Sequence, residues 1–284
     1  MRLISKIFAL FLITSFFHGC DVVEGPYIES NSGGPDTSNT KVRKVFLEDY
    51  TGHTCKNCPE AAVIAKQVAD LYPKQVITLA VHAGFFANPE PQPPYDYDFR
   101  TPTGEAWDQF FGNSNAGNPN GMVDRMDYSN SDHIKGITAW GSLVSQRLQE
   151  PLEAYIVIDS DYNSDNRTAN ISVDTELFQD LTDPLKLVVL LTEDSIVKPQ
   201  KDVDQQGNSI TIYDYVHMHV LRAAINSTWG DELSASGGST GTLFENDYSF
   251  TLDQEYRADQ CHVVAFVYND LTKEVLQAEY APIQ

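Results

Sequence analysis

The sequence of 284 residues lacks an apolar run long enough to cross a bilayer as a helix, and it has few basic residues and few cysteines. A short apolar run at residues 7–17 follows the basic residues Arg2 and Lys6. A run of this length after a positive start is typical of a secretory signal rather than of an anchor helix. We therefore expect residues 1–19 to be a signal peptide.

The shortage of basic residues restricts the classes of partner. The chain has 19 Lys and Arg against 40 Asp and Glu, a formal net charge of −21. Removal of residues 1–19, which hold two basic residues and no acidic residue, leaves a charge of −23. Such a surface argues against nucleic acid as a partner and against electrostatic attraction to anionic lipid. Signatures of serine hydrolases, phosphate loops and dinucleotide-binding folds are also missing.

The first of the four cysteines, Cys20, lies where the signal ends. The stretch LITSFFHGC (12–20) resembles the lipobox of bacterial lipoproteins, which implies cleavage before Cys20 and attachment of a lipid to it. The alternative is a plain secreted protein that is cut nearby. Residues 21–40 are rich in Gly, Ser and Asn, and this composition predicts a flexible tether.

Three cysteines then remain, Cys55, Cys58 and Cys261, so at most one internal disulfide can form. The envelope outside the inner membrane is oxidising. We expect Cys55 and Cys58 to be found as a disulfide.

Hydrophobic periodicity predicts a strand at 41–50, a helix at 59–73 and a strand at 75–84. These elements make a right-handed βαβ unit with parallel strands. The Pro-rich stretch 85–104 predicts a long irregular loop, which is either functional or a surface excursion. A short helix at 105–112, a turn and strand within 117–128, and a longer helix at 131–151 follow.

After Pro151 the pattern changes to strand-length segments that alternate or run apolar, separated by polar turns. This predicts an antiparallel β-sandwich. We therefore expect two domains, an α/β domain at 41–150 and an all-β domain at 151–284.

The segment TGHTCKNCPEA (51–61) places a Cys-x-x-Cys pair between a strand and a helix, as in thiol–disulfide oxidoreductases. The start of a helix favours a thiolate, and Pro59 fits only the first helical turn. Lys56 and His53 would add positive potential. We expect Cys55 to be the more exposed, attacking sulfur, and the inward Cys58 to resolve the mixed disulfide.

Residues 41–150 resemble the thioredoxin-like superfamily. The resemblance implies that Pro119, in AGNPNGM, occupies the cis-proline loop facing the cysteine pair. It also implies a buried acid for proton transfer, either Asp49 or Glu48, because the pattern of a fully buried strand does not fix which side chain faces the pair. Thr54 stands where thioredoxins have tryptophan, and Lys56-Asn57 replaces Gly-Pro between the cysteines, so the direction of electron flow cannot be read.

More narrowly, the chain resembles the Omp28-related outer-membrane lipoproteins. The features that carry the resemblance are the lipoprotein start, FLEDYTGHTCKNCPEA, NPNGMVDR and YVHMHVLRAAINSTWG. It implies a lipid-anchored protein in the outer membrane of a Gram-negative bacterium, with a thioredoxin-like domain followed by an immunoglobulin-like β-sandwich.

Two functional hypotheses follow. The first is thiol–disulfide exchange with protein thiols or disulfides of the envelope, which needs no dissociable cofactor. The second is a binding or scaffold lipoprotein with a structural disulfide. A zinc site is disfavoured because the cysteine pair lacks two further ligands. His217 and His219 would share a strand face, where a pair of histidines is more often surface or core than a metal site.

Overall fold

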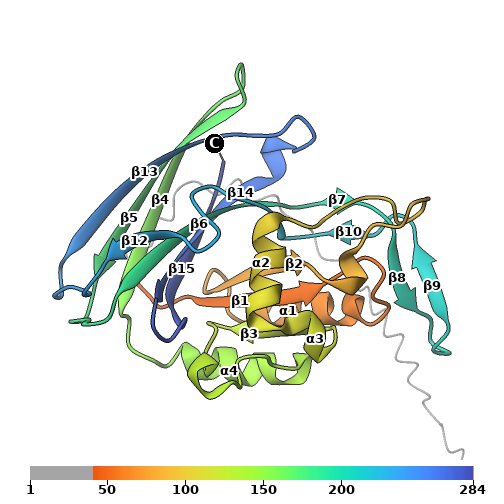
Figure 1. Cartoon of the computed structure of the whole chain (residues 1–284), viewed down its shortest axis with the longest axis horizontal. Helices are drawn as coiled ribbons and strands as arrows, with labels where there is room; N and C mark the ends of the chain where they lie inside the picture. The colour runs from red at the N-terminus through yellow and green to blue at the C-terminus, as the bar shows by residue number, and fades with distance from the viewer. Residues whose placement is uncertain (1–40, 284) are drawn as a thin grey trace, which may run out of the picture. The chain divides into compact units, whose positions relative to one another are not determined.

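Strand β1 (Val45–Thr51) is buried along its whole length, in keeping with its place inside an eight-stranded sheet. This computed structural model describes residues 41–283. Strand β1 pairs in parallel with β2 (Val76–His82), and helix α1 (Cys58–Leu71) connects the two strands. The predicted βαβ unit is therefore confirmed, and on its other side β1 pairs antiparallel with β3 (Asn120–Val123) (Figure 1).

The sheet continues beyond β2 into strands from the second half of the chain. Its order is β15-β14-β6-β11-β2-β1-β3, and β12 pairs with β6. The added strands are β6 (Leu185–Glu193), β11 (Val220–Ala224), β12 (Asp231–Ser234), β14 (Cys261–Asn269) and β15 (Val275–Pro282). Residue 151, the predicted boundary, lies in the link before β4, but the sheet itself runs across both halves of the sequence.

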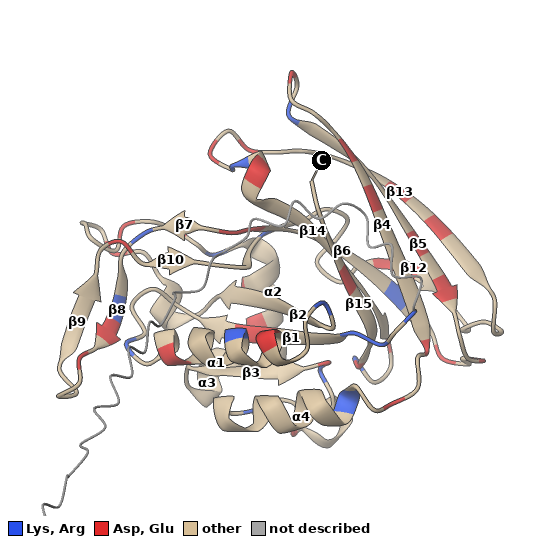
Figure 2. Cartoon of the chain, turned by 180° about the vertical axis from the view of Figure 1, so that it is seen from behind, with Lys and Arg blue, Asp and Glu red and all other residues tan. Residues whose placement is uncertain are grey.

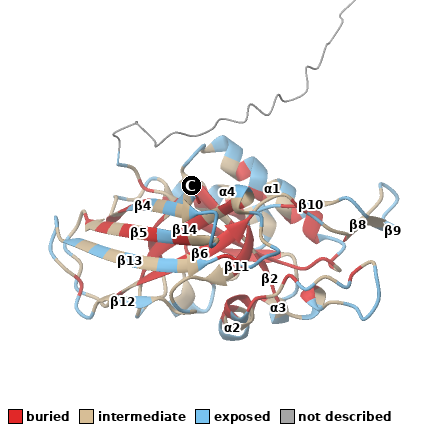
Figure 3. Ribbon diagram, turned by 90° about the horizontal axis from the view of Figure 1, so that it is seen from above, coloured by how far each residue is buried: buried red, intermediate tan, exposed pale blue. Residues whose placement is uncertain are grey.

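A second, three-stranded sheet has the order β13-β5-β4 and is antiparallel throughout. Its strands are β4 (Ala154–Asn163), β5 (Thr168–Leu177) and β13 (Leu243–Thr251). The apolar residues of β4 and β5, such as Ile156 and Val173, share one core with residues of β6 and β14, such as Leu191 and Val263. Strands β6 and β14 are accordingly buried, whereas the sheet β13-β5-β4 keeps an exposed outer face with many acidic residues (Figures 2 and 3).

Helices cover the large sheet on both faces. Helix α2 (Pro102–Phe111) places Trp107 in a core that also holds Phe46 of β1 and Phe266 of β14. On the opposite face, α1 and α4 (Trp140–Arg147) pack on the other side of β1. Within residues 41–283, no helix is both long and apolar enough to cross a membrane. The result is a mixed α/β, sheet-rich fold.

The helix predicted at 131–151 is wrong in its first half. The backbone of Lys135 exchanges two hydrogen bonds with Gly121, at 2.9 and 2.7 Å, so this segment is extended and cannot be helical. The helix proper, α4, begins only at Trp140 after a 3-10 turn, η3 (Ile137–Ala139).

The remaining elements are short. They are η1 (Phe85–Ala87), α3 (Asn113–Ala116), η2 (Tyr128–Asn130), β7 (Ile196–Val197), β8 (Gln200–Val203), β9 (Ser209–Ile212), β10 (Val216–His217) and η4 (Ala258–Gln260). Strands β8 and β9 pair only with each other, as do β7 and β10. The long loop predicted at 85–104 is irregular up to the start of α2, apart from η1.

Candidate functional site

A disulfide joins Cys55 and Cys58 at the start of α1, as the sequence predicts. Cys58 is the first residue of the helix, and Pro59 follows in the first turn, where the missing N–H costs no hydrogen bond. The turn between the cysteines is closed by the Cys58 amide, which donates to the carbonyl oxygen of Cys55 at 3.3 Å. The residue types and their spacing thus place the pair against the positive end of a helix.

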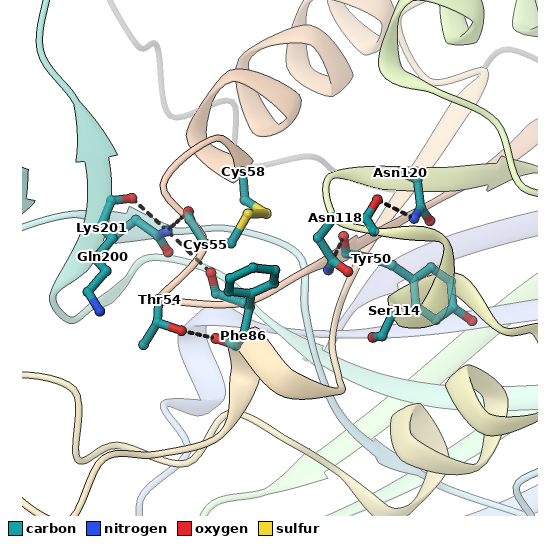
Figure 4. Close-up of a disulfide and its surroundings, with 12 residues drawn as sticks. Tyr50, Thr54, Cys55, Cys58, Phe86, Ser114, Asn118, Asn120, Gln200 and Lys201 are labelled. Atoms are coloured by element: carbon teal, nitrogen blue, oxygen red, sulfur yellow. Dashed lines mark hydrogen bonds between the residues drawn. A yellow bond between two sulfur atoms is a disulfide. The ribbon is translucent and has the colours of Figure 1, made fainter. Parts of the chain in front are cut away.

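The sequence led us to expect Cys55 to be the more exposed of the two cysteines, and this is wrong. Each cysteine is only 2% exposed. Two segments that are distant in sequence form hydrogen bonds to the turn that carries the cysteines. Gln200 at the start of β8 donates from Nε2 to the carbonyl oxygen of Cys55 at 3.0 Å. On the loop after β2, the carbonyl oxygen of Phe86 accepts hydrogen bonds from both the amide and the hydroxyl of Thr54, at 3.1 and 2.8 Å (Figure 4).

The local positive potential is smaller than the sequence suggests. Lys56 is exposed to solvent between the two cysteines. His53 is buried, and this burial lowers the pKa of its imidazole below the usual value. The ring Nε2 lies 3.1 Å from the carbonyl oxygen of Tyr95, which fits a neutral ring that donates this hydrogen bond. At neutral pH, His53 therefore contributes no charge to the site.

Pro119 lies in the loop that enters β3, and the Asn118–Pro119 peptide bond is cis. Strand β3 pairs with the end of β1 through Tyr50 and Asn120, so this loop lies where β1 runs into the Cys-x-x-Cys turn. The side chain of Asn118 donates to the carbonyl oxygen of Tyr50 at 2.9 Å. In the view of Figure 4, Asn118 lies on one side of the disulfide and Gln200 on the other.

Asp49 and Glu48 lie on opposite faces of β1. The carboxylate of Glu48 accepts two hydrogen bonds of 2.8 Å from Arg125, and both side chains are fully buried in the core under α2. Asp49 alternates with it and shares the face of Val45 and Leu47, which pack against α1. Asp49 therefore lies on the face of β1 that is covered by α1, the helix that starts at Cys58.

Burial raises the pKa of the Asp49 carboxyl to about 7. Its Oδ1 atom is buried and, within the described part of the chain, has no hydrogen-bond partner. A carboxyl group in this setting is half protonated near neutral pH and is able to give or take a proton there.

The two histidines of YVHMHVL do not share a strand face. His217 on β10 is buried, with its ring 5.5 Å from that of His82 and its Nε2 3.3 Å from the carbonyl oxygen of Lys198. His219 lies after β10 with a positive φ of 55°, and its Nδ1 is 3.1 Å from Asp194. The positive φ breaks the alternation on which the prediction rested. Among residues 41–283, no three His, Cys, Asp or Glu residues form a group that could hold a metal ion.

Cys261 lies apart from the disulfide, in the core between the two sheets, and it is 1% exposed. Burial raises the pKa of its thiol to about 12. It is a free thiol that stays protonated and unreactive at neutral pH.

Comparison with known proteins decides the family. The family model described as "Outer membrane protein Omp28" matches residues 105–284. The chain belongs to the Omp28 family. The family predicted from the sequence and the outer-membrane location are thereby confirmed. Cys20, the predicted lipid site, lies outside the described residues. No curated protein matches this chain.

Solved structures similar to this Omp28-family chain include HBP35 of Porphyromonas gingivalis, with a TM-score of 0.60 and 17% identity over 86% of this chain and 76% of that one. At this identity the likeness concerns the fold alone. A domain of the outer membrane lipoprotein Omp28 from the same organism matches with a TM-score of 0.33 and 19% identity, over 48% of this chain and 91% of that one.

The sequence of this Omp28-family chain does not reveal which distant residues bond to the cysteine turn, chiefly Gln200, Phe86 and Tyr95. Phe86 and Tyr95 lie in the 85–104 loop, for which a functional role was one of the two readings. No signal in the sequence singles out Gln200, because its partners are 145 and 148 residues away.

Proposed function

We propose that this protein is a lipid-anchored outer-membrane protein whose N-terminal half is thioredoxin-like and exchanges disulfides with protein thiols of the envelope. The observation that carries the proposal is the Cys55–Cys58 disulfide at the start of α1, on the face of β1 that holds the buried carboxyl of Asp49. A redox pair and a proton carrier with a pKa near 7 are the parts that such a reaction requires.

The arrangement of elements supports a thioredoxin-like reading of residues 41–150. A parallel β1–β2 pair is flanked by an antiparallel β3, α1 covers one face and α2 the other, and the Pro119 loop enters β3 beside the cysteine turn. Residues 151–284 support a β-sandwich, because the sheet β13-β5-β4 packs face to face on β6 and β14. In this reading the sandwich and the thioredoxin-like part share the large sheet.

The exchange reaction starts here from the oxidised pair. A substrate thiolate attacks Cys55, a mixed disulfide forms, and Cys58 leaves as a thiolate. A second substrate thiolate then attacks the substrate sulfur of the mixed disulfide and releases Cys55. The substrate loses two electrons and gains a disulfide, and the protein gains both electrons as two thiols. The reverse sequence reduces a substrate disulfide.

Asp49 is the proton carrier of this proposal, and Glu48 is not. Protonated Asp49 would give its proton to the leaving thiolate of Cys58, and the carboxylate would take it back on re-oxidation. Glu48 is committed to Arg125 by two hydrogen bonds and faces the other core. Pro119 would shape one wall of the groove in which the substrate docks.

The proposal is tested by the reduction potential of the pair. The full chain, purified in detergent, is equilibrated with glutathione buffers of graded ratio, and the fraction of reduced Cys55 and Cys58 is read by alkylation and mass spectrometry. We expect a potential between about −120 and −270 mV, the range of known exchangers. A value below about −300 mV is that of a structural disulfide and would reject the proposal.

The burial of both sulfurs favours the second candidate function, a scaffold or binding protein in which the disulfide only fixes the turn before α1. The same titration decides between the two. A Cys55→Ser variant adds a second criterion, because loss of exchange with an unchanged melting temperature supports the exchanger, and loss of stability alone supports the scaffold.

The lipid anchor is a separate part of the proposal, and it rests on the resemblance of residues 12–20 to a lipobox. Cys20→Ala should move the protein from the detergent phase to the aqueous phase in Triton X-114 partitioning. An unchanged partition would remove Cys20 as the anchor.

A further inference from the structure

The hairpin of β8 and β9 is a separate structural unit that lies against the cysteine turn. Its two strands pair only with each other, and it projects from the rest of the chain at the end of the molecule that carries the start of α1 (Figure 1). Among residues 41–283, no side chain of β8 or β9 belongs to the apolar cores that hold the sheets and helices together. The contacts described below between the hairpin and the rest of residues 41–283 are mainly polar.

The first set of contacts fastens β8 to the turn itself. Gln200 is 2% exposed, and its Nε2 lies 3.0 Å from the carbonyl oxygen of Cys55 and 3.3 Å from that of Gly52. The amide of Lys201 donates to the carbonyl oxygen of His53 at 2.9 Å. The start of β8 thus bonds to three of the four residues from Gly52 to Cys55. Figure 4 shows the bond from Gln200 to Cys55.

A second set of contacts fastens the hairpin to the 85–104 loop. The hydroxyl groups of Tyr95 and Thr211 share a hydrogen bond of 2.7 Å. The ammonium group of Lys201 lies 4.8 Å from the centre of the Tyr95 ring and 3.4 Å from Glu90. The side chains of Lys201 and Glu90 are partly exposed to solvent, so this ion pair contributes little to the attachment.

We propose that the β8–β9 hairpin is a lid over the Cys55–Cys58 disulfide, which must lift before a thiol can reach Cys55. A role of the lid in controlling disulfide exchange rests on the proposed exchange function. Its effect on the access of a reductant to Cys55 does not. In the closed position both sulfurs are buried. Opening breaks the hydrogen bonds of Gln200, Lys201 and Thr211 and leaves the core packing intact. A local opening of this kind costs less than global unfolding.

The lid predicts the kinetics of reduction. When opening and closing are fast relative to the attack, the observed rate is the product of the open fraction and the rate at an exposed disulfide. Any change that weakens the lid then raises the rate in proportion to the open fraction. Loss of one neutral hydrogen bond should raise it by about five-fold.

The experiment measures reduction of the disulfide in the full chain by a small phosphine reductant under native conditions, with quenching by alkylation and readout by mass spectrometry. Thr211→Val removes the hydrogen bond to Tyr95 without touching the cysteine turn. Gln200→Ala removes the bonds to the turn. The matched control is Gln206→Ala, an exposed residue of the same hairpin whose amide, and not its side chain, bonds to Asp204.

We expect reduction to be about five-fold faster in Thr211→Val, faster still in Gln200→Ala, and unchanged in Gln206→Ala. Circular dichroism and the melting temperature establish that each variant is folded. Equal rates in all three variants and the native protein would overturn the lid. Acceleration in Gln200→Ala alone would also overturn it, because Gln200 would then act only on the turn.

This outcome is separate from that of the glutathione titration. A disulfide with a potential below about −300 mV whose reduction still accelerates in Thr211→Val leaves the lid standing and rejects the exchange function. A potential in the exchanger range, with reduction rates that are the same in the variants and the native protein, supports the exchange function and rejects the lid.

Discussion

The ring of Phe46 stacks on the ring of Phe266, with their centroids 4.8 Å apart and their planes inclined by 26°. Phe46 belongs to β1 and Phe266 to β14, and both are fully buried. The contact joins the two ends of the sequence inside one core. We therefore expect the two halves of the chain to depend on each other for stability.

Phe266→Ala should lower the free energy of unfolding by about 3–5 kcal/mol, the usual cost of a large cavity in a core. Urea unfolding followed by tryptophan fluorescence gives the value. Leu271→Ala is the control, because Leu271 is 65% exposed in a turn and should change stability by less than about 0.5 kcal/mol. A loss at Phe266 no larger than that of the control would contradict the shared core.

A fragment of residues 41–151 should not fold by itself. It would carry β1, β2 and β3 but leave β2 without β11, and the core face under α2 without Phe266, Tyr268 and Val264. We expect poor dispersion in its amide NMR spectrum and no cooperative thermal transition. A sharp melting transition would show that the first half is an independent domain after all.

Breaking the ion pair of Glu48 and Arg125 should be strongly destabilising. Both side chains are fully buried, so Glu48→Ala leaves an uncompensated guanidinium in the core and should cost about 3–5 kcal/mol in urea unfolding. The double variant Glu48→Leu, Arg125→Met removes both charges and should recover most of this loss. A single variant that loses less than about 1 kcal/mol would mean that water reaches the pair.

Asp49→Asn should change the pH dependence of stability. The folded state keeps the proton on Asp49 up to a pKa of about 7, whereas the unfolded chain releases it near 3.8. Between these values the folded state binds more protons, so this group makes stability fall as pH rises from about 4 to about 7. The total effect is at most about 4 kcal/mol.

The measurement is urea unfolding of both proteins at pH 4.5, 6 and 8. The histidines at 53, 82 and 217 have pKa values lowered by burial and act in the opposite direction, but they are common to both proteins. The difference between variant and native protein isolates Asp49, and we expect the variant to gain stability relative to the native protein as pH rises. A difference that does not vary with pH would mean that Asp49 ionises normally.

Gly52→Ala should displace the 85–104 loop from the cysteine turn. A Cβ atom at Gly52 would lie 2.3 Å from the backbone of Phe86, which cannot yield as a flexible side chain would. We expect a loss of about 1–3 kcal/mol, seen as a drop of several degrees in melting temperature. Gly136→Ala is the control, since nothing lies within 4 Å of its Cβ position and its φ is −68°. Equal melting temperatures for the two variants would contradict the close approach.

The sequence was sufficient for those features that depend on local pattern. The βαβ unit, the disulfide and the position of Pro59 at the helix start follow from periodicity and spacing. The alternative between Asp49 and Glu48 could not be resolved, because β1 is buried on both faces and gives no alternation of polar and apolar residues. Glu48 faces the core under α2, where it bonds to Arg125. Arg125 lies in a turn and has a positive φ, which no sequence pattern predicts.

The burial of the two cysteines could not be predicted either, for a different reason. An exposed Cys55 is the expectation for a Cys-x-x-Cys turn taken alone. In the folded chain Cys55 is 2% exposed and its carbonyl oxygen is bonded to Gln200, and contacts between residues so far apart depend on the complete tertiary structure. The sequence also could not predict that the two halves share one sheet. Strand β2 pairs with β11 at a single pair of residues, Ala80 and Val220, which are far apart in the sequence.

Strand β1 belongs to a sheet whose last strands in the sequence are β14 and β15. This order has a consequence for biogenesis. In a polypeptide exported from its N-terminus, these last strands would emerge roughly two hundred residues after β1, so we expect the sheet to stay incomplete until then. During that interval Cys55 and Cys58 are already outside and only three positions apart, whereas Cys261 is still to come. We therefore expect the order of export to favour the Cys55–Cys58 pairing before Cys261 is available.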